Sequence, residues 1–184
     1  MSKLTLSELK KELKQYDQKE LTQLVVDLYK LNDDVKHYLG SRLKGEEAIV
    51  ELFETTKKKI KDEFFPDRGF GKMRLKEAKN AISNFKKLSN DKLKTLDLMV
   101  FYVEVGTKFT DTYGDIDERF YNSMVSMFAK VCDECEKDEQ TFNIFADRLS
   151  ALVEESKGIG WGYYDALSDL YYSIEWAWED ENLQ

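Results

Sequence analysis

Residues 92–113, KLKTLDLMVFYVEVGTKFTDTY, decide the fold class, because apolar side chains cover most of their helical circumference. One apolar face consists of Leu96, Met99, Val100 and Val103, and the opposite face of Leu98, Phe101, Val105 and Phe109. Only a narrow stripe is charged, and it consists of Asp97, Glu104, Lys108 and Asp111. A helix that is apolar on most sides lies inside a fold. We therefore predict that this segment is the central helix.

Apolar residues recur at helical spacing along the rest of the chain, and only one proline, Pro66, interrupts them. No alternating strand pattern appears. The sequence predicts an all-α fold of eight to nine antiparallel helices, arranged as a helical bundle or a short α-solenoid. We expect residues 1–44 to form a semi-independent helical hairpin with a third helix, and residues 45–184 to form the main helical domain.

The first two predicted helices each begin with a capping box, Thr5 with Glu8 and Asp17 with Glu20. Their apolar stripes are expected to face each other in the hairpin. The stripes consist of Leu6, Leu9 and Leu13 on the first helix and of Leu21, Leu24, Val25 and Leu28 on the second.

Charge is divided unevenly along the 184 residues, whose formal net charge is −8. Residues 1–95 have a net charge of +6 and residues 96–184 a net charge of −14, while the segment 57–94 alone has +8. The basic segment could contact phosphates, but aromatic residues are not interleaved with its lysines. No apolar run has the ~20 residues needed to cross a bilayer. Two cysteines in a chain of this length give no disulfide framework, so we expect a cytoplasmic protein.

A mixture of acids, glycines and aromatics fills residues 102–127. Glu104, Asp111, Asp115 and Asp117 offer oxygen ligands to a hard cation, although their spacing does not fit an EF-hand. A structural interpretation is also available. Gly114 can end the central helix, Asp115 can cap the next helix with Glu118 at its third position, and Glu104 can pair with Lys108.

The same mixture returns in residues 158–172, GIGWGYYDALSDLYY. The glycines around Trp161 precede a predicted C-terminal helix over residues 163–178. One face of this helix is apolar and consists of Leu167, Tyr171, Ile174 and Trp178. The opposite face carries Asp165, Asp169, Tyr172 and Trp176. Aromatics beside acids on a face turned away from the core indicate a second contact, with the chain itself, a ligand or a partner.

Cys132 and Cys135 lie three residues apart on an apolar helical face. A lone pair of cysteines supplies only half of a tetrahedral zinc site. We therefore predict that both are core residues.

Three stretches give the chain a resemblance to a family of small uncharacterised bacterial proteins, an all-helical domain of unknown function. They are the opening hairpin LSELKKELKQYDQKELTQLVVDLY, the central FYVEVGTKFTDTYGDIDERFYNSMVSMF and the closing GIGWGYYDALSDLYY. The resemblance implies no established activity, cofactor or catalytic residue. It implies that the central and closing stretches belong to one site.

From these observations we expect a non-enzymatic binding or interaction module, with a cleft between residues 92–113 and residues 163–178 as its contact surface. No cofactor and no membrane contact is indicated, and the partner is another protein or a second copy of the chain. One alternative is a divalent-cation-dependent enzyme that uses Glu104, Asp111, Asp115, Asp165 and Asp169. Another, which the overall acidity disfavours, is nucleic-acid association through residues 57–94.

Overall fold

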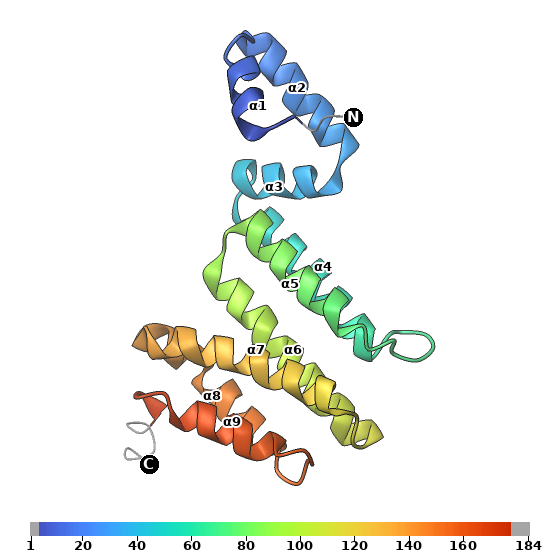
Figure 1. Cartoon of the computed structure of the whole chain (residues 1–184), viewed down its shortest axis with the longest axis vertical. Helices are drawn as coiled ribbons and strands as arrows, with labels where there is room; N and C mark the ends of the chain where they lie inside the picture. The colour runs from blue at the N-terminus through green and yellow to red at the C-terminus, as the bar shows by residue number, and fades with distance from the viewer. Residues whose placement is uncertain (1–3, 178–184) are drawn as a thin grey trace. The chain divides into compact units, whose positions relative to one another are not determined.

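The computed structural model describes residues 4–177, and this part of the chain is all-α, with nine helices and no strand (Figure 1). The helices are α1 (Leu6–Leu13), α2 (Gln18–Leu31), α3 (Asp33–Leu43), α4 (Glu46–Phe64), α5 (Leu75–Ser89), α6 (Lys92–Tyr113), α7 (Glu118–Glu136), α8 (Glu139–Glu155) and α9 (Tyr163–Tyr172). The predicted fold class is confirmed. The predicted central helix has the bounds of α6.

Both predicted capping boxes are present. The Thr5 hydroxyl accepts from the Glu8 amide while the Glu8 carboxylate accepts from the Thr5 amide, and Asp17 and Glu20 repeat this exchange. Asn32 caps α3, and its side-chain oxygen accepts from the amides of Asp34 and Val35. These interactions satisfy amide groups that a helix start leaves without an intrahelical partner.

Three predicted boundaries are wrong. From the sequence, the polar pair Ser89-Asn90 is expected to cap α6. Asp91 forms the cap instead, because Asn90 takes the left-handed conformation that ends α5. Asp117, and not Asp115, caps α7. Helix α9 ends at Tyr172 and not at residue 178, since the amide of Ile174 bonds to the carbonyl of Tyr171 in a tighter turn. Trp178, expected on the apolar face of this helix, lies outside the described residues.

Contacts divide the chain into two compact units, Met1–Ile49 and Val50–Gln184. In the first unit α2 packs along α3, but neither α1 nor α2 has a buried residue. The apolar stripes expected to bury each other therefore stay largely exposed, with only Leu13 and Leu24 partly covered. The semi-independent behaviour of residues 1–44 stays a prediction.

In the second unit α6 packs against α5, α7 and α8, and α7 also contacts α9 (Figure 1). Most of both apolar faces of α6 is buried, including Leu98, Val100 and Val103, and only Met99 and Phe101 are half-buried, so its central position is confirmed. Gly106 permits a close approach of α6 to α7, because an added Cβ would lie 2.3 Å from the sulfur of Met124. None of the described helices combines the length and the apolar character that a membrane crossing requires.

Candidate functional site

The two glycine-acid-aromatic stretches touch each other in the second unit. The Tyr121 hydroxyl donates to Asp115 Oδ1 at 3.0 Å, and the Gly160 amide donates to the same oxygen at 3.4 Å. Deeper in the fold, the hydroxyls of Thr107 and Tyr163 are hydrogen-bonded at 2.8 Å. The loop before α9 is therefore held against the end of α6 and the start of α7.

Tyr121 is the centre of this junction. Its ring stacks on Trp161, with centroids 6.3 Å apart, and lies 5.3 Å from the ring of Tyr163. Tyr121 is buried, and burial raises the pKa of its phenol, although a 2.6 Å hydrogen bond with Thr110 opposes the shift. Trp161 forms the outer layer, since it is 59% exposed, and its φ of 63° is unusual for a residue with a side chain.

The other predicted site residues do not converge on this junction. Asp111, Asp165 and Asp169 are exposed, and Asp117 accepts from the Phe120 amide as the cap of α7. Tyr172 and Trp176 are only half-buried, so the second aromatic face of the C-terminal segment remains partly open. The buried Nε1 of Trp176 has no hydrogen-bond partner among residues 4–177.

Glu104 belongs to an ion-pair cluster between α6 and α8. Arg148 of α8 donates to both carboxylate oxygens of Glu104, at 2.6 and 2.9 Å, and to Asp97 at 2.6 Å. Burial disfavours the guanidinium charge, but these hydrogen bonds outweigh it and raise the pKa of Arg148. The expected pairing of Glu104 with Lys108 is wrong, because a guanidinium binds a carboxylate through two parallel bonds and an ammonium cannot.

A cation site would require three or more of the predicted carboxylates at one point. Within residues 4–177, no group of three or more His, Cys, Asp or Glu side chains is placed to hold a metal ion. The structure therefore gives no geometric support to the cation-dependent alternative.

The basic segment 57–94 is partly neutralised within the second unit. Lys58 pairs with Asp62 and Asp67, and Lys94 pairs with Asp91. Lys57 lies over the ring of Phe101 at 4.8 Å. The four lysines of α5, Lys76, Lys79, Lys86 and Lys87, have no ion-pair partner among residues 4–177, so nucleic-acid association through this segment stays a prediction.

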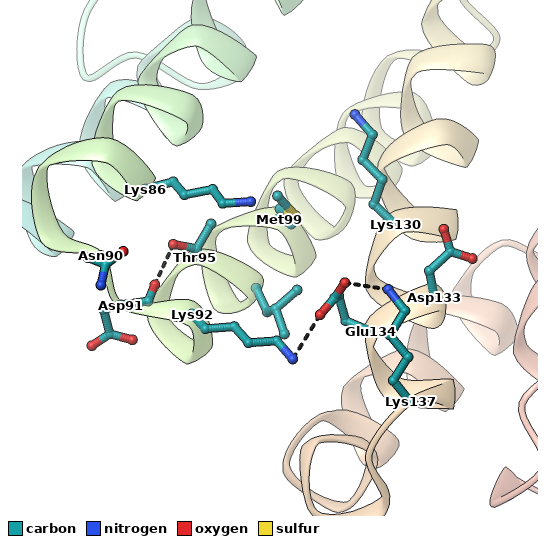
Figure 2. A pocket seen from close by; sticks show the side chains of 11 residues that line it. Lys86, Asn90, Asp91, Lys92, Thr95, Met99, Lys130, Asp133, Glu134 and Lys137 are labelled. Atoms are coloured by element: carbon teal, nitrogen blue, oxygen red, sulfur yellow. Dashed lines mark hydrogen bonds and ion pairs between the residues drawn. The ribbon is translucent and has the colours of Figure 1, made fainter.

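A hollow of about 370 Å³ lies between the α5–α6 turn and the last part of α7, and Figure 2 shows it from close by. We call it the lysine pocket. It is lined by Lys86, Asn90, Asp91, Lys92, Thr95, Leu96, Met99, Lys130, Asp133, Glu134 and Lys137. Four lysines and three acids thus surround the apolar side chains of Leu96 and Met99.

Glu134 forms ion pairs with two of the four lysines of the pocket. Its carboxylate lies 2.8 Å from the Lys92 ammonium and 2.7 Å from that of Lys137 (Figure 2). Hydrogen bonds from Lys137 and Lys92 lower the pKa of Glu134 to about 2. Asp91 is occupied as the cap of α6 and as the partner of Lys94.

Lys86 and Lys130 are different, because neither forms an ion pair with any residue between 4 and 177. Lys86 reaches from α5 toward Met99, and Lys130 lies across the pocket on α7 (Figure 2). Two uncompensated cations from separate helices therefore flank an apolar surface.

Neither the role of Arg148 nor the lysine pocket was predicted from the sequence, although the residue spacing contains an indication of each. Arg148 is the only basic residue between Lys137 and Lys157, and the acids of α6 recur every seven residues. Lys130 and Lys137 are also seven apart, in a half of the chain that has only six basic residues. Spacing of seven places side chains on one side of a helix.

The part of the chain that the structure describes thus belongs to the class of all-α helical proteins. The chain belongs to a family of unknown function, DUF6155, which matches residues 1–174. This confirms the resemblance to an all-helical family of unknown function. No curated protein and no solved structure shows a significant match to the chain.

Proposed function

We propose that the chain is a non-enzymatic binding module, and that the lysine pocket holds the anionic group of a small organic ligand. One observation carries the proposal. Lys86 and Lys130 flank Leu96 and Met99 without an ion pair to any residue of the described range. Cations beside an apolar surface suit a molecule that carries both a carboxylate or phosphate and an apolar part.

The dimensions and the chemistry of the pocket support this role. Its volume of about 370 Å³ falls within the ~300–1,000 Å³ typical of small-molecule sites. Its only lining hydroxyl, that of Thr95, donates to the carbonyl of Asp91, and no lining residue is a histidine or cysteine. The lining thus supplies charge and apolar contact without an activated nucleophile.

Calorimetric titration with inorganic phosphate, citrate and a nucleoside monophosphate tests the proposal. At least one anion should bind, and Lys86→Ala and Lys130→Ala should each weaken it roughly tenfold. Lys76→Ala is the matched control, since Lys76 is an exposed lysine of α5 outside the pocket. Absence of binding by all three anions, or equal weakening in Lys76→Ala, would overturn the proposal.

A second candidate function is the binding of a protein partner at the contact surface that we expected between α6 and the C-terminal segment. The observation that favours it is Trp161, 59% exposed, with a positive φ, and next to Gly160, which touches Asp115. An exposed indole beside a carboxylate suits an arginine or lysine of a protein partner. Calorimetric titration with an arginine-rich peptide should show binding to the wild type and to Trp161→Phe, which keeps an aromatic face, but much weaker binding to Trp161→Ala. Equal binding by Trp161→Ala would exclude this surface.

We also propose that the protein is cytoplasmic. Cys132 and Cys135 are both free thiols in the core. Reduced cysteines are the rule in reducing compartments.

A further inference from the structure

The first unit leaves a large apolar surface uncovered. Twelve large apolar side chains of residues 4–49 are between 36% and 81% exposed. On α2 the stripe of Leu21, Val25 and Leu28 is exposed by 36%, 45% and 45%. These positions lie at i, i+4 and i+7, so they form one continuous ridge.

We infer that this ridge, together with the apolar stripe of α1, is the surface through which two copies of the chain associate. The net charge of the first unit favours a second copy of the chain as the partner on this surface. Residues 1–49 contain nine basic and nine acidic residues, a net charge of zero, whereas residues 50–184 have a net charge of −8. In a two-fold dimer the same surface meets itself, so a balanced surface is compatible with self-association and a strongly charged one is repelled.

The exposed apolar area of the first unit is of the size that an interface needs. A stable interface buries about 800 Å² from each partner. The twelve apolar side chains, about half exposed, present on the order of 1,000 Å² together. Five of them lie on the two stripes, namely Leu6, Leu9, Leu21, Val25 and Leu28. Pairing of two hairpins would give a four-helix arrangement in which apolar stripes become an interior.

Light scattering after gel filtration of the full chain tests the inference. At tens of micromolar, the wild type should have twice the 21.6 kDa mass of one chain, in low and in moderate salt alike. Val25→Lys and Leu28→Lys should each weaken the dimer roughly tenfold or more, because each buries a charge in place of an apolar group. Both side chains are exposed in the single chain, so helix content by circular dichroism should not change.

Ile144→Lys is the matched control, because Ile144 on α8 is 55% exposed but belongs to the second unit. It should remain a dimer. A monomeric wild type, an unchanged mass in both first-unit variants, or dissociation by Ile144→Lys would each overturn the inference. A monomeric wild type whose melting temperature falls in Val25→Lys would show that the chain itself covers the ridge.

Discussion

Arg148 of α8 and Glu104 of α6 are joined by two hydrogen bonds, Nε to Oε1 at 2.6 Å and Nη2 to Oε2 at 2.9 Å. The remaining terminal nitrogen of Arg148 donates to Asp97, which lies about two helical turns before Glu104 on α6. A single guanidinium therefore pairs with two of the three carboxylates in the charged stripe of α6. Glu104, a candidate ligand-binding residue from the sequence, instead holds α8 against α6.

Arg148→Ala should reduce the free energy of unfolding by about 1–3 kcal/mol, because Glu104 and Asp97 would remain half-buried and unpaired. Urea unfolding measures the change. Lys157→Ala is the control, since it removes an exposed pair with Glu154, which water and salt screen, and should leave the free energy of unfolding almost unchanged. Equal losses in the two variants would contradict a special role for the α6–α8 cluster.

Gly106→Ala should destabilise the fold by about 1–3 kcal/mol, because the new methyl group would overlap the sulfur of Met124. The same change in a Met124→Ala background should be neutral or stabilising, since alanine favours the helix by about 1 kcal/mol over glycine. A double-mutant cycle of thermal or urea unfolding measures this coupling. Additive effects would show that the helices do not approach closely at this point.

Stability should fall as the pH rises above about 9. Burial raises the pKa of Cys135 from 9.0 to about 11 and that of Tyr102 from 10.0 to about 12, and it also raises the pKa of Cys132. In this range the unfolded chain loses protons that the folded chain retains, so unfolding becomes more favourable as pH increases.

Unfolding by urea between about pH 8 and about pH 11 measures the effect. Cys135→Ala should reduce the slope of stability against pH, because it removes one of the buried acids. A slope that is flat in the wild type, or unchanged in Cys135→Ala, would contradict this assignment.

Glu134→Gln should increase the affinity of the lysine pocket for an anion by roughly three- to tenfold, because it releases Lys92 and Lys137 from their exposed pairs. The anion that binds best to the wild type is the probe. Asp133→Asn is the matched control, since it removes one negative charge from the same lining without breaking an ion pair. Equal gains in both variants would mean that only the overall charge matters.

Much of the secondary structure could be predicted, because helix starts and stops depend on nearby residues. The capping boxes of Thr5 and Asp17 act over three residues, and the bounds of α6 follow from its own apolar pattern. The errors arose where two local signals competed. Asp115 and Asp117 are both good caps, and the fold assigns Asp115 to Tyr121 and Gly160.

The candidate sites were harder to predict, because each depends on helices that are far apart in sequence. The aromatic junction was expected in outline, as contact between residues 102–127 and 158–172. Asp115 and Trp161 were among the predicted site residues, but Tyr121 and Gly160 were not, and Asp165 and Asp169 lie at exposed positions outside the junction. Glu104 was predicted as a ligand or partner contact, whereas its ion-pair partner in the structure is Arg148, which lies 44 residues away in the sequence.

The pattern of apolar residues predicted the all-α fold, the central position of α6 and the burial of the two cysteines, because apolar periodicity acts within a single helix. The pairing of Arg148 with Glu104, the contact of Asp115 with Gly160 and the position of Lys86 and Lys130 beside one pocket became evident only from the packing of the helices. A hydrogen bond is directed, and a strong ion pair requires contact between the two side chains. Each partner therefore depends on how the helices pack and not on the pattern along any one of them.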